Sequence, residues 1–299
     1  MEYDKILPEI IKKNDKKILL LVIDGVGGIP DPETGKTELE TANIPNIDDF
    51  AKRGSCGLST PVLPGITPGS GPGHIALFGY DPIEVQIGRG VLECLGIGLH
   101  LDKDDIAIRG NFATIDENNI VIDRRAGRIP TEENKKLVEL ISENIKEIKG
   151  VKISISTVKE HRCAIILKGN KLSPEVSEND PQKEGLPLKE IIPLDEKAKF
   201  TAEILNEFEK KVKEILKNTD SKAKVILLRG ISKLPDIPTF EEKYKLKSAC
   251  IATYPMYKGV SKVVGMDIIE AGETVEEEFE TLNKISSGGT SNNCLLENS

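Results

Sequence analysis

Residues 16–28 read KKILLLVIDGVGG, and this stretch decides the fold class. Its apolar run, Ile18 to Ile23, ends abruptly at Asp24 and is followed by glycines. A short apolar run bounded by turn residues is typical of a strand that is buried on both faces of a parallel sheet. An aspartate at the carboxyl end of such a strand lies in the crevice where open α/β sheets bind ligands. We therefore expect an α/β fold with Asp24 at a ligand-binding edge, although an ordinary Asp-Gly turn would have the same sequence.

Apolar runs and amphipathic segments alternate through most of the chain, but the pattern changes near residue 106. This interruption predicts a doubly wound sheet with a small α/β domain inserted into it. The expected parts are a core from 1–105 and 191–284, an insert at 106–190, and an atypical tail at 285–299. The core is expected to resume with a strand at 223–230.

Local signals predict several individual elements. Residues 106–128 contain two apolar runs separated by an Asn-rich turn, which predicts a hairpin. Residues 198–217 form a strongly amphipathic pattern and predict a helix. The Pro- and Gly-rich residues 60–74 predict a loop followed by a helix from His74, and the glycines of 86–99 predict a further loop.

Composition excludes several classes of protein. The net charge is −8, so there is no basic excess that would favour nucleic acid. The longest apolar run is far too short to span a membrane, and the first residues lack the apolar region of a secretory signal. The 5 cysteines are widely spaced and contain no CxxC pair, which indicates reduced, mostly buried thiols. We therefore expect a cytoplasmic protein that binds neither nucleic acid nor membrane; the oligomeric state is left open.

Arginine is scarce and unevenly distributed. The chain contains 41 basic residues, but arginine occurs only at positions 53, 89, 109, 124, 125, 128, 162 and 229. Five of these eight positions fall between 109 and 162. Because the planar guanidinium suits carboxylate and phosphate groups, this clustering indicates an anion site, with structural ion pairs as the alternative.

Ser70 is a second candidate for chemistry. It lies in TPGSGPGH, residues 67–74, immediately before a predicted helix whose amino end would favour a phosphate. A serine hydroxyl needs a base or a metal to become a good nucleophile. Residues 68 and 72 are prolines, so the GxSxG pattern of α/β-hydrolases is absent. Together with Asp24, Ser70 predicts a metal-plus-serine site for phosphoryl transfer.

A series of motifs then resembles one family closely. In chain order they are LLLVIDGVGG, TPGSGPGHIALFGYDP, GRGVLECLGIG, RGNFATID, DRRAGR, EHR, ILLRG, PTFEEKYKLKSACIA, YPMYKG and VVGMDII. This series resembles the cofactor-independent phosphoglycerate mutases of the archaeal type, in the alkaline phosphatase superfamily, over residues 16 to about 284. The resemblance implies a glycolytic enzyme that interconverts 3-phosphoglycerate and 2-phosphoglycerate through a phosphoserine. It also implies divalent metal ions, usually manganese, with magnesium, cobalt or zinc as alternatives.

The resemblance assigns roles to particular residues. Asp24 corresponds to a metal ligand, and Ser70 to the phosphorylated serine that also contacts a metal. Lys258 resembles a lysine that steadies the phosphoryl group, and His74 would either orient its loop or take part in catalysis. The residues implied to bind the phosphorylated substrate are Arg89, Arg109, Asp123, Arg124, Arg128, His161 and Arg162.

The metal ligands expected after residue 284 are absent from the sequence. The family supplies further aspartates and histidines there, whereas this chain has histidine only at positions 74, 100 and 161. We therefore expect an incomplete metal site in the chain as written, through truncation or a shifted reading frame. Two alternatives to a mutase remain open at this stage: a metal-dependent phosphatase of the same superfamily, and a non-catalytic remnant.

Overall fold

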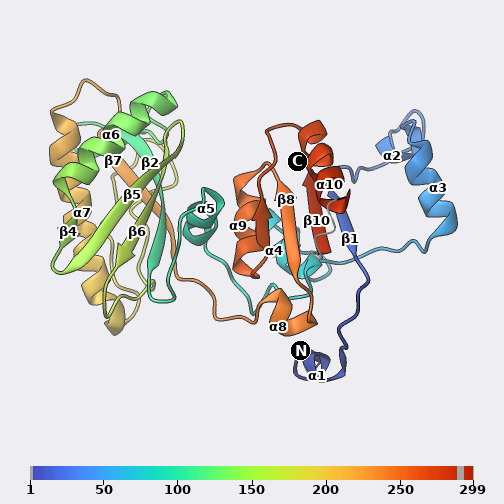
Figure 1. Cartoon of the computed structure of the whole chain (residues 1–299). Helices are drawn as coiled ribbons and strands as arrows, with labels where there is room; N and C mark the ends of the chain where they lie inside the picture. The colour runs from blue at the N-terminus through green and yellow to red at the C-terminus, as the bar shows by residue number, and fades with distance from the viewer. Residues whose placement is uncertain (1–2, 288–292, 299) are drawn as a thin grey trace. The chain divides into compact units, whose positions relative to one another are not determined.

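The computed structural model describes residues 3–287 and 293–298, and the chain divides into two compact units (Figure 1). Unit 1 comprises Met1–Val85 and Pro238–Ser299, and unit 2 comprises Gln86–Ile237. Unit 2 is therefore one continuous segment, whereas unit 1 is made of two. The boundaries differ from the prediction, because residues 86–105 and 191–237 pack with the insert rather than with the core.

Unit 2 is built on an antiparallel sheet whose central strand is β2 (Ile106–Ile115). The other strands are β3 (Val121–Asp123), β4 (Glu147–Ile148), β5 (Val151–Lys159), β6 (Arg162–Lys168) and β7 (Val225–Ser232). Strand β2 pairs with β6 on one side and β7 on the other. It also pairs with β3 through Thr114 and Asp123, which confirms the predicted hairpin.

Strand β7 corrects the sequence prediction. Residues 223–230 were expected to resume the parallel core, but β7 runs antiparallel to β2, with Arg229 opposite Arg109. The apolar run of β7 correctly predicted a buried strand, since Val225 to Leu228 are all buried. A buried run carries no information about strand direction or sheet membership, and this explains the error.

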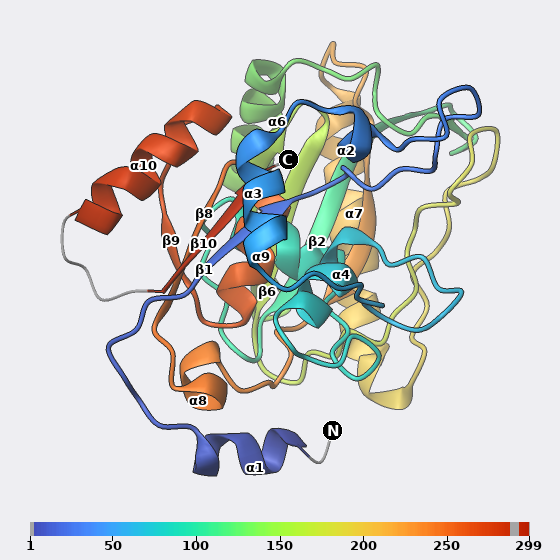
Figure 2. The same cartoon turned by 90° about the vertical axis from the view of Figure 1, so that its right-hand side faces the viewer.

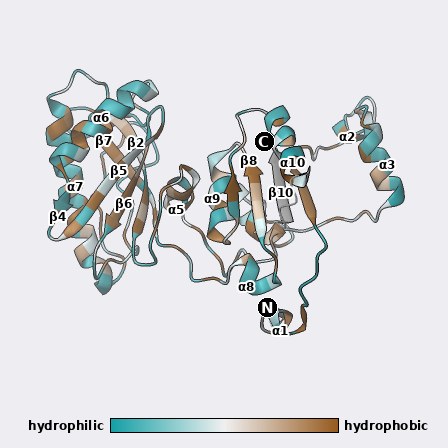
Figure 3. Ribbon diagram, in the orientation of Figure 1, coloured by the Kyte–Doolittle hydropathy of each residue, from teal (hydrophilic) through white to brown (hydrophobic). Residues whose placement is uncertain are grey.

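Helices cover one face of this sheet. They are α6 (Thr131–Asn144) and α7 (Lys199–Lys217), the latter preceded by a 3-10 turn at Glu196–Ala198. Their apolar residues pack against alternate strand positions such as Ile108 and Phe112, both fully buried. Hydrophobic and hydrophilic colouring alternates along α6 and α7, as expected for helices with one buried face (Figure 3). The remaining strand positions, including Arg109, point to the opposite face.

Helix α5 (Arg89–Gly96) forms where the sequence predicted a loop. Its residues Val91, Leu92, Cys94 and Leu95 are buried, so an apolar face is present despite the glycines. A Cβ added at Gly90 would lie 2.2 Å from the Ala107 carbonyl oxygen and 2.6 Å from that of Gly230. Gly90 therefore permits close packing of α5 on β2 and β7 rather than marking a loop.

Unit 1 contains a parallel sheet with strand order β1-β10-β8-β9 (Figure 2). The strands are β1 (Leu19–Ile23), β8 (Ser248–Ala252), β9 (Asp267–Ile269) and β10 (Asn293–Asn298). The helices are α1 (Tyr3–Ile10), α2 (Glu38–Thr41), α3 (Pro45–Arg53), α4 (Ser70–Leu77), α8 (Phe240–Tyr244), α9 (Pro255–Val263) and α10 (Val275–Ser287). Parallel strands alternating with helices confirm the predicted α/β class.

Strand β1 is not buried on both faces as predicted. Leu19, Leu20, Leu21 and Ile23 are between 38% and 56% exposed, whereas the apolar residues of β8 from Ala249 to Ala252 are fully buried. Strand β1 lies at the edge of the sheet, where β10 is its one strand partner among the residues that the structure describes. The apolar run therefore predicted the strand and its direction, but the edge position leaves its side chains exposed.

Residues 285–299, expected to be an atypical tail, contain regular secondary structure. Residues 285–287 continue α10, and 293–298 form β10, which pairs in parallel with both β1 and β8; 288–292 and 299 lie outside the described residues. Backbone groups make these pairs, so a polar sequence does not prevent them. No helix in the described part of the chain is long and apolar enough to span a membrane.

Candidate functional site

Asp24 lies directly after β1 and is exposed. Its carboxylate accepts a short hydrogen bond from the hydroxyl of Tyr257 on α9. The Tyr257 ring in turn contacts the His74 ring, with 4.7 Å between the ring centroids. Unit 1 therefore links Asp24 to the Ser70 helix through Tyr257, a residue that the sequence did not single out.

Ser70 is the first residue of α4 and is exposed, so the helix begins four residues earlier than predicted. This position places the serine among the free amide groups of the helix amino terminus. His74 Nδ1 lies 2.6 Å from the Ser70 carbonyl oxygen. A carbonyl only accepts, so His74 Nδ1 carries the proton of this bond. The contact supports the orienting role for His74, one of the two that were considered.

The described residues do not complete a metal site in unit 1. Asp24 and Ser70 are suitable oxygen donors for a divalent cation. However, in residues 3–287 and 293–298 no three His, Cys, Asp or Glu side chains come together in a way that could hold a metal ion. Lys258, on α9, donates to Glu270 at 2.9 Å and is occupied by that ion pair.

Three arginines lie on the sheet face of unit 2 opposite α6 and α7. Arg109 on β2 lies directly across from Arg229 on β7, and Arg162 on β6 pairs with Asn111, two residues along β2. Because side chains alternate along a strand, all three point to the same face. Arg109 feels the charges of Arg162, Arg229 and Arg89. Burial and these like charges lower the Arg109 pKa, against the opposing effect of Glu93.

Glu93 of α5 lies among these arginines. Its carboxylate is 3.8 Å from Arg109 Nε and 3.6 Å from Arg162 Nη1. Neither contact is a hydrogen bond, and Glu93 Oε1 and Arg109 Nε are both buried without a hydrogen-bond partner. Buried polar atoms without partners are uncommon in folded proteins and indicate a place for a ligand or water. The unpartnered Arg109 Nε and the excess of positive charge would favour an anion there.

His161 borders the same group. It is buried, and its Nδ1 has no hydrogen-bond partner in the described residues. Burial, followed by the nearby charge of Arg162, lowers the pKa of His161 below its ordinary value of 6.5. His161 is therefore neutral at pH 7 and presents one donor and one acceptor.

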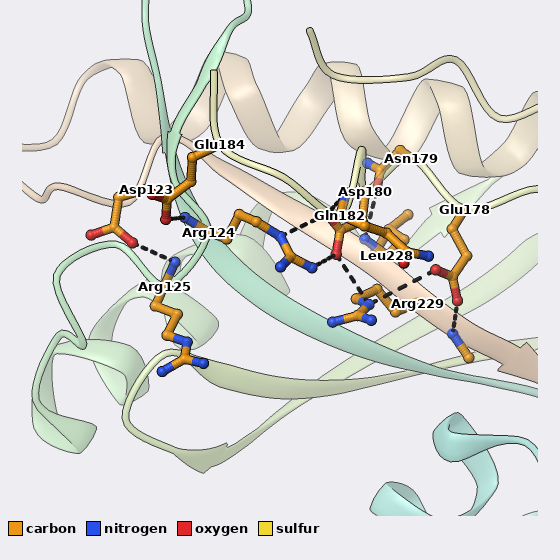
Figure 4. A network of polar contacts seen from close by, with 11 residues as sticks. Asp123, Arg124, Arg125, Glu178, Asn179, Asp180, Gln182, Glu184, Leu228 and Arg229 are labelled. Carbon is orange, nitrogen blue, oxygen red and sulfur yellow. Dashed lines mark hydrogen bonds and ion pairs between the residues drawn. The ribbon is translucent and has the colours of Figure 1, made fainter. Parts of the chain in front are cut away.

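A second polar network begins at Arg124 (Figure 4). Arg124 donates to Asp180 through Nε at 3.0 Å and Nη2 at 2.6 Å. Arg229 Nε lies 3.1 Å from the same carboxylate. Asp180 thus joins Arg124, in the turn after β3, to Arg229 on the sheet face that also carries Arg109 and Arg162.

Asp123 and Arg128 shape the turn that carries Arg124. Asp123 accepts hydrogen bonds from the backbone N–H groups of Arg125 at 2.7 Å and Gly127 at 2.6 Å. Ala126, Gly127 and Arg128 are consecutive residues with left-handed φ angles of 47°, 67° and 53°. The Asp123 carboxylate is therefore used within the turn, and the Arg128 side chain is exposed.

Comparison with known proteins then decides the family. Residues 51–221 match the sequence model of 2,3-bisphosphoglycerate-independent phosphoglycerate mutase. A probable mutase of this name from Thermosipho africanus is 51% identical over 285 residues, covering 95% of this chain and 70% of that protein. The corresponding Aquifex aeolicus protein is 51% identical over 288 residues, with 94% and 70% covered. This chain belongs to that mutase family.

A solved structure agrees with the assignment. The cofactor-independent phosphoglycerate mutase from Thermoplasma acidophilum superposes with a TM-score of 0.73 at 31% identity, covering 95% of this chain and 78% of that one. Membership of the mutase family confirms the resemblance stated from the motifs and makes the chain an isomerase. It also favours the mutase over the phosphatase and the non-catalytic remnant.

The structure brings together only part of the residues that sequence reasoning selected. Arg89, Arg109, His161 and Arg162 are electrostatic neighbours within unit 2. Arg124 lies in the adjoining network with Asp180, whereas Asp24, Ser70 and Lys258 belong to unit 1. Sequence reasoning missed Glu93, Asp180 and Arg229. A single charge in the apolar run VLECL was the available signal for Glu93, but no local pattern distinguishes Asp180.

Proposed function

We propose that this chain interconverts 3-phosphoglycerate and 2-phosphoglycerate, with unit 2 holding the glycerate phosphate and Ser70 accepting the phosphoryl group. The main support is the face of the unit 2 sheet that carries Arg109 and Arg162. There Arg109 Nε and Glu93 Oε1 are buried without hydrogen-bond partners. Phosphoglycerate carries a carboxylate and a phosphate, and both groups match guanidinium donors.

Two successive transfers account for the reaction. Ser70 Oγ attacks phosphorus, the bond from phosphorus to O3 of the substrate breaks, and one proton passes from Ser70 Oγ to O3. The 2-hydroxyl of the retained glycerate then attacks the phosphorus of the phosphoserine, the bond from phosphorus to Ser70 Oγ breaks, and the proton of the 2-hydroxyl returns to Ser70 Oγ. The amino end of α4 favours the negative phosphoryl group during both transfers.

Other residues have proposed roles in the same reaction. Arg89, Arg124, Arg128 and His161 are proposed to line the substrate site, with Asp123 shaping it and Lys258 steadying the phosphoryl group. Asp24 and Ser70 are proposed ligands of a divalent cation, with manganese expected. The described residues supply only part of the coordination that a divalent cation needs. A cytoplasmic, glycolytic role follows from the proposed reaction.

Turnover of 3-phosphoglycerate by the full chain with added manganese tests the reaction. We expect 2-phosphoglycerate to form with wild-type protein and with Ser59→Ala, which changes another exposed serine of unit 1, but not with Ser70→Ala. Incubation with substrate should also leave a phosphate on wild-type protein that Ser70→Ala lacks. Release of free phosphate without isomerisation would identify a phosphatase instead, and no turnover with any divalent metal would contradict the proposal.

Substrate binding can be tested separately from turnover. Arg109→Ala should weaken binding of 3-phosphoglycerate about tenfold or more, because a hydrogen bond to a charged group contributes about 1.5–3 kcal/mol. Arg53→Ala, which removes an exposed arginine of unit 1, should leave binding unchanged. Calorimetric titration of both variants measures the difference, and equal affinities would remove Arg109 from the site.

A further inference from the structure

Residues 178–182 lie along the edge of β7 that faces away from β2. The Asn179 side chain accepts from Leu228 N at 2.6 Å and donates to the Ile226 carbonyl oxygen at 3.2 Å. Glu178 Oε1 accepts from Gly230 N at 2.8 Å. These side chains satisfy backbone groups that a further strand would otherwise bind. The next residue, Asp180, is thereby fixed relative to β7.

Asp180 is a buried carboxylate that is fully hydrogen-bonded. Its side chain is 0% exposed, and besides the two bonds from Arg124 it accepts one from Gln182 N at 2.8 Å. Burial alone would raise the pKa of Asp180, but the bonds from Arg124 and Gln182 hold the pKa below its ordinary value. Asp180 is therefore charged at neutral pH, and it lies between two guanidinium groups.

Asp180 engages only one edge of each arginine. Arg124 uses Nε and Nη2, and Arg229 presents Nε, whereas Arg124 Nη1 and both terminal nitrogens of Arg229 make no hydrogen bond within the described residues. The Arg124 and Arg229 side chains are 25% and 22% exposed, so these free N–H groups remain accessible. Figure 4 shows the Arg229 terminal nitrogens pointing away from the aspartate.

We propose that Asp180 is a positioning residue that holds Arg124 and Arg229 ready to bind one oxyanion of the phosphoglycerate. The proposal rests on the proposed function and adds Arg229 to the site. Two like charges repel when they are brought together, and long side chains lose conformational freedom when a ligand orders them. Asp180 offsets the repulsion and orders both guanidinium groups before the substrate arrives, which strengthens binding.

Binding of 3-phosphoglycerate to the full chain tests the role of Asp180. Calorimetric titration with a chelator present separates binding from turnover. Asp180→Asn keeps the shape but removes the charge, and we expect the dissociation constant to rise about tenfold. Asp180→Glu should restore part of the affinity. The matched control is Asp220→Asn, the same change at an exposed position of unit 2, which should bind as wild type does.

A double-mutant cycle separates positioning from general destabilisation. In the Arg124→Ala, Arg229→Ala background, Asp180→Asn should weaken binding little further, because the residues through which it acts are gone. An equal loss in both backgrounds, or wild-type affinity for Asp180→Asn, would overturn the proposal. If wild-type protein itself does not bind 3-phosphoglycerate, the proposed function fails first.

A further variant covers the case in which Asp180→Asn does not fold, as thermal unfolding followed by circular dichroism would reveal. Arg229→Lys keeps the positive charge but removes the planar group that Asp180 orients. We expect it to weaken binding several-fold. Unchanged affinity would show that charge alone matters and would reject positioning by Asp180.

Discussion

Asp180 and Glu93 are both carboxylates that lie between two arginines of unit 2, yet their surroundings differ. Asp180 is fully buried and accepts short hydrogen bonds from Arg124 and Gln182. Glu93 lies 3.6–3.8 Å from Arg162 and Arg109, accepts no hydrogen bond from either, and leaves Oε1 buried without a partner. The same combination of charges therefore forms a hydrogen-bonded cluster around Asp180 but leaves polar atoms unpaired around Glu93. The unpartnered donor there is Arg109 Nε, and leaving such a buried group unpaired costs about 1–3 kcal/mol, which a bound anion can recover.

The largest expected effect comes from moving the helix that carries Glu93. Gly90→Ala would place a Cβ against the backbone oxygens of Ala107 and Gly230, so α5 must shift from the sheet. We expect a loss of about 3 kcal/mol in the free energy of unfolding, the upper end for overpacking. Urea unfolding followed by circular dichroism measures it, since the chain has no tryptophan.

The control for this change is Gly57→Ala, because a Cβ at Gly57 meets no atom within 4 Å. The shift of α5 should also weaken anion binding, while the Asp180 bonds remain. Wild-type stability for Gly90→Ala would show that α5 does not need this close approach.

A smaller effect is expected from removing the charge of Glu93, and it is a gain in anion affinity rather than a loss. Glu93→Gln removes a carboxylate that competes with a bound anion for Arg109 and Arg162. We expect inorganic phosphate to bind about fivefold more tightly, equivalent to about 1 kcal/mol, whereas Asp180→Asn should weaken substrate binding. Calorimetric titration measures the change, with Glu139→Gln on the exposed side of α6 as the matched control. Weaker binding by Glu93→Gln would mean that Glu93 orders the arginines as Asp180 does.

The smallest effect concerns pH and His161, which adjoins Arg109 and Arg162. Burial lowers the His161 pKa below 6.5, so the unfolded chain binds a proton at a higher pH than the folded chain. Stability from this residue is therefore present above pH 6.5 and is lost as pH falls below that value. We expect the free energy of unfolding to fall between pH 6.5 and 5.5 by less than about 1.4 kcal/mol, the amount that one pH unit allows for a single group.

Unfolding of His161→Gln as a function of pH checks this contribution. The variant should show a shallower dependence on pH between 5.5 and 6.5, whereas His100→Gln, at an exposed histidine, should follow wild type. Identical slopes for His161→Gln and wild type would assign the pH dependence to other groups.

The sequence predicted individual strands and helices better than it predicted which strands pair with one another. The apolar runs of β1 and β7 identified both strands, but neither run showed that β1 lies at an edge or that β7 is antiparallel. The glycines of α5 resembled a loop because sequence alone does not reveal the backbone oxygens that Gly90 approaches. Strand partners and close approaches depend on residues far apart in the chain, and local patterns do not contain them.

The candidate site shows the same limit. Arginine clustering and the motifs selected Arg109, Arg124 and Arg162 from sequence, because scarce guanidinium groups are informative on their own. Asp180 was not selected, since an aspartate in a polar loop is ordinary until the fold places it against two arginines. Residues that act on a ligand leave a chemical signature in the sequence, whereas residues that act through others depend on the fold.

The discontinuity of unit 1 has a consequence for synthesis. Unit 2 is one continuous segment and contains all strands of its own sheet, so it can fold as soon as residue 237 has left the ribosome. Strand β1 is made before unit 2, but its partner β10 is made more than 250 residues after β1. Throughout that interval the apolar strand has no pairing partner, which is the condition under which nascent chains depend on chaperones.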